Sequence, residues 1–480
     1  MDPRRASGFE AAFQAFARDE PVALDVVDLF RRTAATVPAY RKFLAEHGID
    51  PSAVATVSDV LGLPAVDKES YLRRYPLPEL CRGGTLEGCD IVSVSSGSSG
   101  EPTIWPRSVT DELHVARRFE QVFRDGFGAD RRSTLAVVCF PLGTWVGGLF
   151  TVACTRHLSG KGYPVTTVAP GNNPAEILRV LPDLAPHFDQ VVLLGYPPFL
   201  KGVIDAGVAA GVPWRDYAVK LVLAGEVFSE QWRDLVAGRA GIADPVCDVA
   251  ALYGTADAGV LGNETPLSVA VRRFLAGRPE LAREVFGDAR LPTLVQYDPA
   301  SRLFEAVDGR LLFSADGGIP LIRYQINDEG GLFGHRELLD LCVAHGFSLE
   351  AAGPELPFVF VFGRSLFTVS YFGANVYPEN VTVGLEQPGI SDQVTGKFVL
   401  EAVEDADRDR RLRVTVECAP GHSDASPAEI ARSIRDHLVR LNSEFAHYVP
   451  ADRQLPDVAL RGFQDPEYFP PGVKHRYTRG

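Results

Sequence analysis

Short apolar runs that alternate with helical patterns after Asp90 constrain the fold more than any other feature of the chain. Each run is rich in β-branched residues and is bounded by Gly or Pro, which is typical of strands. Apolar residues with helical spacing separate the runs, for example over 111–123 and 175–181. This alternation predicts an α/β fold with a largely parallel, buried sheet. The predicted strands cover 91–94, 134–139, 190–194, 219–224 and 246–252.

The regions on either side follow different patterns. Up to about Pro64, apolar residues recur with helical spacing, which predicts helices that face the core. Residues 310–324 and 358–369 are strand-rich with glycine turns, and they predict a smaller β element that closes the large domain.

From about Ser365 the pattern predicts a small α+β domain. Residues 397–403 and 411–418 flank a charged turn and indicate a hairpin. Ser426 precedes Pro427, which predicts the capped start of a helix, and a strand is expected at 458–460. We therefore expect a large domain, residues 1–364, and a small lid domain, residues 365–480.

Composition excludes several classes of function. The 480 residues carry 48 Lys and Arg against 62 Asp and Glu, a net charge of −14, so nucleic acid and anionic membranes are disfavoured as partners. No apolar run approaches the roughly 20 residues that a bilayer requires, and the N-terminus lacks a secretory signal, which predicts a cytoplasmic protein. The seven cysteines form no close pair, so neither a disulfide scaffold nor a zinc cluster is expected, and any metal should arrive with a ligand.

A serine-glycine loop directly follows the predicted strand 91–94. Its small residues allow close approach of a ligand, and its N–H and hydroxyl donors suit phosphate oxygens. It lacks the Gly-Lys-Ser/Thr ending of the Walker loop, and a flexible surface loop is the alternative. The loop consists of Ser95, Ser96, Gly97, Ser98, Ser99 and Gly100.

This loop is similar to the signature of the adenylate-forming superfamily, which includes acyl-CoA synthetases, adenylation domains and luciferases. The Pro-Thr ending at 102–103 looks most like the phenylacetate-CoA ligase branch. Further motifs resemble that family's in the family's order and cover most of the chain. They are Leu63-Pro64 with Asp67-Lys68, Ala224-Gly225-Glu226, the segment 253–257, Arg323 to Asp328, Gly363-Arg364, the segment 373–378, and Pro471 to Lys474.

The resemblance implies a role for each motif. Lys474 would be the catalytic lysine, Asp257 would bind Mg²⁺, and the Tyr253 ring would stack on adenine. Asp328 and Arg364 would reach the ribose. The implied ATP- and AMP-binding residues are the six loop residues 95–100 together with Gly225, Glu226, Tyr253, Gly254, Thr255, Asp328 and Arg364.

The implied reaction needs these residue types. Attack of a carboxylate on the α-phosphate of ATP brings two anions together, so donors and cations must offset the developing charge. In a globally acidic protein the positive groups must be concentrated locally, and we expect them at Lys474, Arg364, Arg323 and a Mg²⁺ at Asp257. For these residues the alternatives are a solvated tail lysine, surface salt bridges and a core tyrosine.

The chain departs from the family in three places. Asp257 stands where Glu is usual, and Ala256 stands where Thr or Ser would touch the α-phosphate, a loss of about 1 to 3 kcal/mol unless Thr255 substitutes. At the hinge, Gly363-Arg364 is followed by Ser365-Leu366-Phe367 where relatives have a polar pivot. Because the pivot allows the rotation from adenylation to thioester formation, adenylation is the better supported half-reaction.

An aromatic acid pocket is predicted after two of the strands. Phe140, Trp145 and Gly147 fall where the family's acyl-binding segment lies, and Tyr196 is expected to add a wall. Apolar aromatics around glycines form a flat slot that suits an aromatic acid. The alternative is that Phe140 and Trp145 are core residues.

The sequence therefore predicts an enzyme that uses ATP and Mg²⁺ to convert an aryl or arylacetic acid into an acyl-adenylate, with coenzyme A as acceptor. One alternative is a stand-alone adenylating enzyme that serves a carrier-protein thiol or an amine, or that activates nitrite. Another is a non-catalytic nucleotide-binding relative, suggested by Ala256 and Leu366. The acid, the acceptor and the oligomeric state are not fixed by the sequence.

Overall fold

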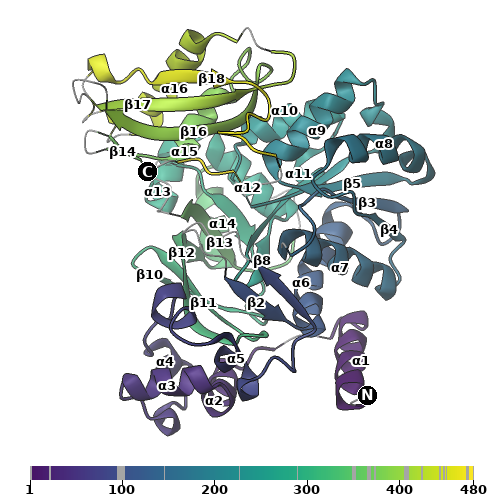
Figure 1. Ribbon diagram of the computed structural model, residues 1–480, viewed down its shortest axis with the longest axis vertical. Helices are drawn as coiled ribbons and strands as arrows, with labels where there is room; N and C mark the ends of the chain where they lie inside the picture. Colours follow the sequence, from purple (N-terminus) through teal and green to yellow (C-terminus); the bar gives the residue numbers. More distant parts are fainter. Residues whose placement is uncertain are drawn as a thin grey trace.

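The computed structural model describes most of the chain (Figure 1). The described residues are 3–20, 23–94, 103–144, 146–225, 227–288, 290–348, 353–364, 369–371, 374–404, 410–422, 425–442, 445–446, 449, 451–471 and 475–478.

A sheet of 11 strands forms the centre of the molecule, in the order β10-β11-β12-β13-β9-β8-β7-β6-β5-β3-β4. Neighbouring strands from β4 to β7 are parallel, and those from β7 to β10 are antiparallel. The parallel part comprises β3 (Thr134–Val138), β4 (Val165–Val168), β5 (Gln190–Gly195), β6 (Lys220–Ala224) and β7 (Val249–Thr255). The antiparallel part comprises β8 (Gly259–Asn263), β9 (Thr293–Gln296), β10 (Leu303–Val307), β11 (Arg310–Ala315), β12 (Leu321–Phe333) and β13 (Phe358–Arg364).

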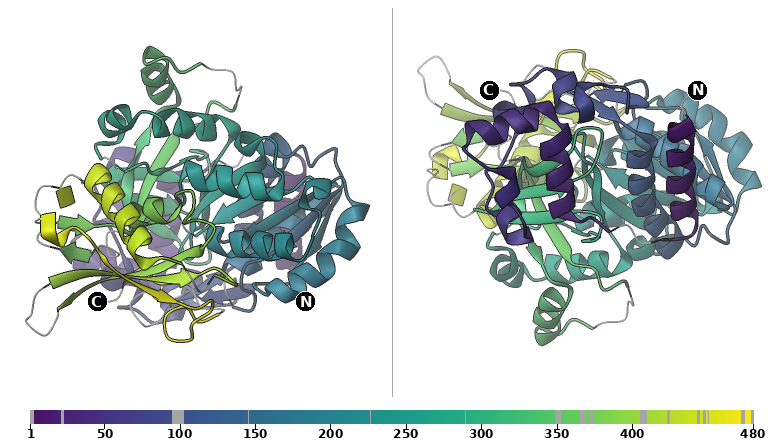
Figure 2. Two further views of the ribbon diagram at one scale, coloured as in Figure 1. Left: turned by 90° about the horizontal axis from the view of Figure 1, so that it is seen from above. Right: turned by 90° about the horizontal axis from the view of Figure 1, so that it is seen from below.

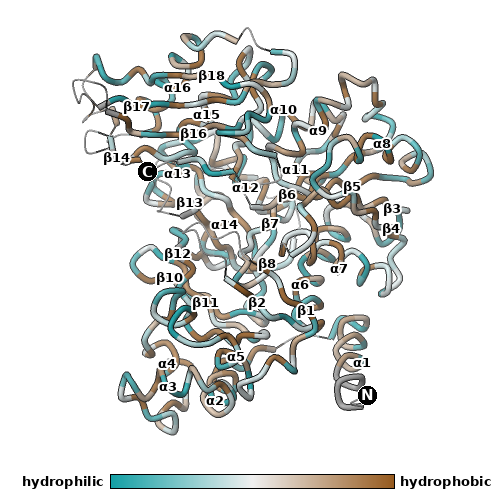
Figure 3. Tube along the Cα trace, viewed as in Figure 1, coloured by the Kyte–Doolittle hydropathy of each residue, from teal (hydrophilic) through white to brown (hydrophobic). Residues whose placement is uncertain are grey.

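Helices cover both faces of the parallel part, which explains its continuous apolar runs. Successive side chains of β3 point to opposite faces: Leu135 and Val137 belong to one buried cluster, and Ala136 and Val138 to another. Figure 3 shows the hydrophobic residues gathered along β3 and β5. The covering helices are α6 (Val109–Gln121) and α7 (Val146–Lys161) on one face, and α8 (Pro174–Leu184), α9 (Pro197–Ala209) and α10 (Glu230–Ala240) on the other.

The remaining elements of the large part pack around the central sheet and its covering helices, and β1 and β2 form a separate two-stranded sheet. Helices α2 to α4 pack under β11 and β12, at the opposite end of the molecule from the last 110 residues (Figures 1 and 2). The elements are α1 (Pro3–Ala17), α2 (Val26–Thr36), α3 (Pro38–Glu46), α4 (Val57–Leu61), α5 (Leu77–Leu80), β1 (Ile91–Val94), β2 (Ile104–Arg107), α11 (Pro245–Asp248), α12 (Pro266–Ala276), α13 (Pro279–Phe286) and α14 (His335–Ala344).

A smaller C-terminal domain has a buried apolar cluster of its own, which includes Phe398, Val414 and Ile434. The predicted hairpin is confirmed, because β16 pairs antiparallel with β17. The predicted helix cap is also confirmed, since Ser426 accepts from the Glu429 N–H. The elements are β14 (Val369–Tyr371), β15 (Ala374–Val376), α15 (Pro378–Leu385), β16 (Val394–Glu404), β17 (Arg410–Cys418), α16 (Pro427–Leu441) and β18 (Asp457–Arg461).

Two predictions of local structure are corrected. Residues 245–248 form the short helix α11, because Asp244 caps it and Pro245 occupies its first turn, so the strand begins only at Val249. Residues 310–324 and 358–364 do not form a separate closing element: β12 pairs with β13 and β13 with β9, which continues the central sheet. Strand partners so far apart in the chain leave no trace in local periodicity.

The α/β class predicted from the alternating pattern is confirmed. None of the helices formed by the described residues has the length and apolar character needed to traverse a membrane.

Candidate active site

The carboxyl ends of the parallel strands meet at one edge of the sheet, the usual place for a ligand in an open α/β fold. Phe140 follows β3, Tyr196 follows β5, and Gly225 follows β6. Tyr253 and Thr255 lie at the carboxyl end of β7. Residues predicted for the nucleotide and for the acid are thus brought to the same edge.

Gly225 is in close contact with Tyr196. Its φ of +83° lies in the left-handed region, and a Cβ placed there would come within 2.6 Å of Tyr196 Cε1. On its other side, the Tyr196 ring packs edge-on against Phe140 at a centroid distance of 5.1 Å. Only glycine allows the ring to lie flat against the chain at this point.

The other predicted pocket residues lie beside Phe140. The backbone of Gly147 faces the Phe140 ring, and a Cβ on this glycine would lie 3.7 Å from Phe140 Cδ1. Phe140 is 2% exposed and belongs to the core cluster under α6 and α7, so its ring supports Tyr196 from within the core. Trp145 lies outside the described residues.

Tyr253 and Asp328 are joined directly. The Tyr253 hydroxyl donates to Asp328 Oδ2 at 2.8 Å, and both side chains are buried. Asp328 on β12 lies opposite Arg364 at the end of β13. The hydrogen bond therefore joins β7 to β12, which lie four places apart in the sheet, and brings the predicted adenine and ribose residues together.

Two other predicted residues shape the β7–β8 turn. The Thr255 hydroxyl, next to Ala256, accepts from the Ala258 N–H at 3.2 Å. Gly254 approaches the Gly259 carbonyl so closely that a Cβ would lie 2.7 Å from it.

Asp257, the predicted metal ligand, already has two protein partners. The Tyr324 hydroxyl donates to Asp257 Oδ2 at 2.6 Å, and Lys68 Nζ forms an ion pair with Oδ1 at 3.2 Å. The Asp257 side chain is only 1% exposed.

Two buried arginines hold the backbone around Asp257. Arg107 donates to the carbonyls of Ala256 and Asp257 at 2.6 and 2.7 Å, and Arg302 donates to the Ala258 carbonyl at 3.0 Å. Burial lowers the pKa of Arg302 to about 10, and the charge of Arg107 acts in the same direction. Neither arginine stands in a motif that marks it, so sequence reasoning missed both.

This arrangement does not suit a metal ion. Mg²⁺ needs octahedral oxygen coordination and keeps several waters. In this buried carboxylate, Oδ2 accepts a hydrogen bond from Tyr324, whereas Oδ1 accepts none from the described residues and is ion-paired with Lys68; arginines occupy the neighbouring carbonyls. Among the described residues, no group of three or more His, Cys, Asp or Glu side chains is placed to bind a metal.

The Leu63-Pro64 and Asp67-Lys68 motif delivers Lys68 to this point. Val66 bridges to β12, with the Val66 N–H bonded to the Arg323 carbonyl and the Gln325 N–H bonded to the Val66 carbonyl. Asp67 then caps a π-helical turn that begins at Lys68. The backbone of β12 thereby fixes the lysine beside Asp257.

Arg323 does not supply charge to the site, which corrects that expectation. Its guanidinium pairs with Glu305 at 2.8 Å and donates to the Leu63 carbonyl. Alternation along β12 directs Arg323 away from the face that carries Tyr324, so it holds the N-terminal motif instead.

The chain around the predicted hinge is densely charged. The guanidinium of Arg290 stacks on the Tyr377 ring at 3.8 Å and pairs with Asp288 at 2.8 Å. Glu379 lies against Gly363, and burial raises the pKa of this carboxyl while Arg290 acts in the opposite sense. Strand β13, which ends at Arg364, therefore lies near charged groups from both sides of the predicted hinge: Asp288 and Arg290 before it and Glu379 after it.

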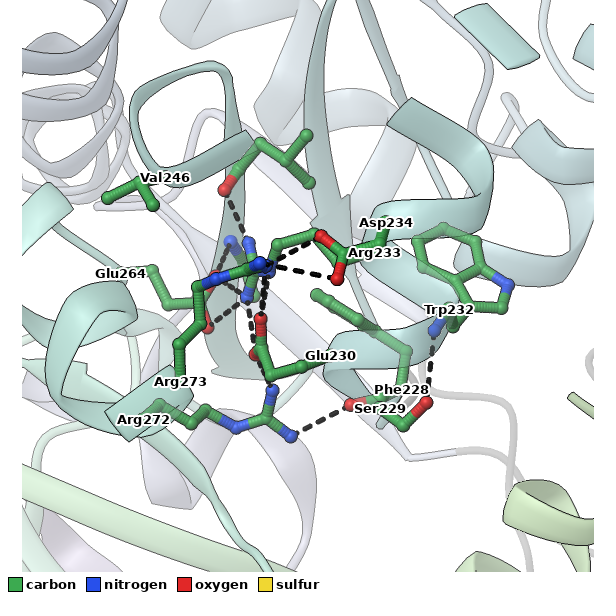
Figure 4. A network of polar contacts seen from close by, with 12 residues as sticks. Phe228, Ser229, Glu230, Trp232, Arg233, Asp234, Val246, Glu264, Arg272 and Arg273 are labelled. Carbon is green, nitrogen blue, oxygen red and sulfur yellow. Dashed lines mark hydrogen bonds and ion pairs between the residues drawn. The ribbon is translucent and has the colours of Figure 1, made fainter. Parts of the chain in front are cut away.

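A buried ionic network supports the loop that carries Gly225 (Figure 4). Arg233, fully buried, binds Glu230 at 2.9 Å, Glu264 at 2.8 Å and the Val249 carbonyl at 2.6 Å. Arg272 pairs with Glu230 and donates to the Phe228 carbonyl at 2.8 Å. Burial acts to raise the pKa of Glu230, but the charges of Arg272 and Arg233 outweigh it and the pKa lies below its ordinary value.

Several predicted residues lie outside the described part of the chain. The segment after Lys474 is nevertheless held firmly, since His475 Nε2 lies 2.6 Å from the Phe398 carbonyl and the Leu400 N–H bonds to the Tyr477 carbonyl at 2.6 Å. The residues not described are Ser95 to Gly100, Trp145, Glu226, the hinge residues Ser365, Leu366 and Phe367, Lys474, and the side chain of Arg364.

Comparisons place this architecture in a known class. No protein-family model matches the chain, and no curated protein matches it significantly. Among solved structures the chain shares its fold with 2-hydroxyisobutyryl-CoA ligase, which confirms the predicted fold without singling out the phenylacetate-CoA ligase branch.

Three structures of one ligase, in different states, are similar to this chain. 2-Hydroxyisobutyryl-CoA ligase in the postadenylation state has a TM-score of 0.66 at 16% identity, over 99% of this chain and 91% of that chain. Its open conformation with 2-HIB-AMP and CoA has a TM-score of 0.54 at 15% identity, over 100% and 94%. Its thioesterification state, also with 2-HIB-AMP and CoA, has 0.53 at 15% identity, over 99% and 91%. At these identities the likeness establishes the fold.

Proposed function

We propose that this protein is an ATP-dependent enzyme that converts a carboxylic acid into an acyl-adenylate with release of pyrophosphate, and then transfers the acyl group to coenzyme A. One observation carries the proposal: the Tyr253–Asp328 pair and the Tyr196–Gly225 contact lie at the same edge of the sheet. Structures of this fold hold 2-HIB-AMP and CoA.

The proposed roles follow from this edge. The Tyr253 ring faces adenine, Asp328 and Arg364 take the ribose hydroxyls, and Gly225 with Glu226 lines the base. The loop from Ser95 to Gly100 supplies donors to the phosphates, with the Thr255 hydroxyl as a further donor where Ala256 offers none. Tyr196, with Phe140, Trp145 and Gly147 around it, forms one wall of the acid pocket.

The proposed lid is residues 365–480, which carry Lys474, on a large domain of residues 1–364. The separate apolar cluster from Val369 to Val449 supports this boundary. Lys474 would offset the charge of the α-phosphate and the substrate carboxylate, and the contacts of His475 with β16 would set its position.

A second candidate is a stand-alone adenylating enzyme that transfers to a carrier-protein thiol or an amine. The hinge sequence favours it, because Leu366 and Phe367 replace the polar pivot of the family. In that case the first half-reaction would be unchanged, and coenzyme A would have no effect on turnover.

Pyrophosphate release with a panel of aryl, arylacetic and short hydroxy acids, with and without coenzyme A, tests the proposal. We expect release with at least one acid and a thioester by mass spectrometry when coenzyme A is present. Release without any thioester would favour the second candidate, and no release with any acid would contradict both. Lys474→Ala should abolish release, whereas Lys42→Ala, which removes a surface lysine paired with Glu79, should not.

A further inference from the structure

Three cationic side chains surround the turn that carries Asp257. Lys68 pairs with its carboxylate at 3.2 Å, Arg107 donates to the carbonyls of Ala256 and Asp257, and Arg302 donates to the Ala258 carbonyl. The Tyr324 hydroxyl holds the second carboxylate oxygen. The charge of Asp257 is therefore compensated by the protein itself.

The Lys68 side chain is held in place from several directions. Lys68 is the first residue of a π-helical turn, and the residue that caps this turn, Asp67, accepts from the Ser70 N–H at 2.7 Å. The Lys68 ammonium lies 5.9 Å from the centre of the Trp105 ring. Its side chain is 25% exposed, whereas that of Asp257 is 1% exposed. The ammonium thus stands on the solvent side of the carboxylate, where an entering cation would have to approach.

A divalent ion at Asp257 would meet two costs. Lys68 would have to leave Oδ1, the carboxylate oxygen that Tyr324 does not hold, and a double positive charge would then lie close to Arg107 and Arg302 inside the protein, where charges are poorly screened. Mg²⁺ also loses its waters reluctantly, which a carboxylate this deeply buried would require.

We propose that Lys68 is the built-in counter-ion of Asp257 and excludes divalent metal from this carboxylate. Asp257 is then a positioning residue that holds Lys68 and Tyr324 at the edge of the nucleotide site, and any Mg²⁺ in the reaction is bound by the phosphates of ATP. The proposal deepens the proposed function, but its test uses the protein without nucleotide or acid, so either can fail alone.

The experiment is a Mn²⁺ titration of the full chain without nucleotide, with free Mn²⁺ measured by its electron paramagnetic resonance signal. We expect no stoichiometric binding by the wild-type protein. Lys68→Gln should create one site, at least about tenfold tighter than any residual wild-type binding, because Asp257 loses its counter-ion. The double variant Lys68→Gln with Asp257→Asn should lose that site, and Lys68→Arg should behave as wild type.

Lys42→Gln is the matched control, because it removes a lysine from an ion pair at the surface and should change nothing. The proposal is overturned if the wild-type protein binds one Mn²⁺ that Asp257→Asn abolishes, or if folded Lys68→Gln gains no site. If circular dichroism shows that Lys68→Gln does not fold, the comparison of wild type with Asp257→Asn decides: absence of a shared site supports the proposal, and its presence overturns it.

Discussion

The Tyr253 hydroxyl donates to Asp328 Oδ2 at 2.8 Å across 75 residues of sequence. A second bond of the same kind runs in the opposite sense, from Tyr324 on β12 to Asp257 after β7, at 2.6 Å. The two bonds cross-link the end of β7 with β12. They fix both acids of the candidate site through tyrosines that alternate with them along the chain.

Tyr253→Phe should lower the free energy of unfolding by about 1.5 to 3 kcal/mol, because it removes a buried hydrogen bond to a carboxylate. The phenyl ring keeps its stacking surface, so AMP affinity by calorimetry should fall less than in Tyr253→Ala. Tyr71→Phe is the control: the Tyr71 hydroxyl is buried without a hydrogen-bond partner among the described residues, so its removal should be neutral or stabilising. Equal losses in the two Phe variants would contradict the assignment.

Gly225→Ala should disturb the site without unfolding the protein. Its methyl group would press on the Tyr196 ring at 2.6 Å, and φ of +83° is strained for alanine by about 1 to 2 kcal/mol. We expect a loss of acid-dependent pyrophosphate release. Tyr196→Ala in the same chain relieves the contact but not the strain, and should restore part of the AMP affinity. Full activity of Gly225→Ala alone would rule out the close packing described.

Arg233→Met should be strongly destabilising, by about 3 to 5 kcal/mol, because it leaves Glu230 and Glu264 buried with fewer partners. Arg273→Met is the matched control. Arg273 binds the same Glu230 but is 29% exposed, so its loss should cost less than about 1 kcal/mol. Chemical denaturation measures both. Adding Glu264→Gln to Arg233→Met should recover stability; further loss would show that charge burial is not the cause.

The His475 imidazole should make the protein acid-sensitive. Burial lowers the pKa of His475 to about 4, against the opposite effect of the Phe398 carbonyl. Above about pH 6.5 the ring is neutral in both states; as the pH falls toward 4, the unfolded chain takes up the proton first, so unfolding becomes easier by roughly 3 kcal/mol at most. His475→Gln should flatten the stability profile between pH 6.5 and 4. His422→Gln, at an exposed site, should leave it unchanged.

The Glu386 carboxyl, at the contact between the large part and the C-terminal domain, should make the protein less stable as the pH rises, which is opposite to the effect of His475. It touches Ser229 and lines a small space with Lys201, Phe228 and Tyr477. Burial raises its pKa to about 7, so the folded state holds a proton that the unfolded chain has released above about pH 4.5. The stability it contributes at low pH is lost as the pH rises toward 7.

Thermal unfolding between pH 5 and 8 tests this. Glu386→Gln should lose the fall in stability over that range relative to wild type, because glutamine cannot ionise. Glu284→Gln, at an exposed site, serves as the control. An unchanged profile in Glu386→Gln would mean that its carboxyl is already ionised in the folded protein.

The strands of the parallel part were predictable because both of their faces are buried, and continuous apolar runs such as 134–138 and 190–195 result directly. The cap of α16 was predictable for a different reason: Ser426 acts on the N–H of Glu429 only three residues away. The antiparallel partners β9, β12 and β13 were not, since their pairing joins residues more than 60 positions apart for β9 and β13.

The candidate site likewise has residues that could be predicted from the sequence and contacts that could not. The resemblance of short motifs to those of a known family was enough to select Gly225, Tyr253, Asp257 and Asp328 as candidate site residues. Their partners were not contained in any local pattern. Lys68 reaches Asp257 only because the backbone at Val66 bridges to β12.

The sequence by itself determined the α/β class, the strands whose ends form the site, and the chemical types that line it, because these depend on local periodicity and on side-chain chemistry. Only the tertiary structure decided that Asp257 pairs with Lys68 and accepts a hydrogen bond from Tyr324, and that Arg323 points away from the site. The physical reason is that a carboxylate's function depends on which charges stand within a few ångströms of it, and chain folding alone sets those neighbours.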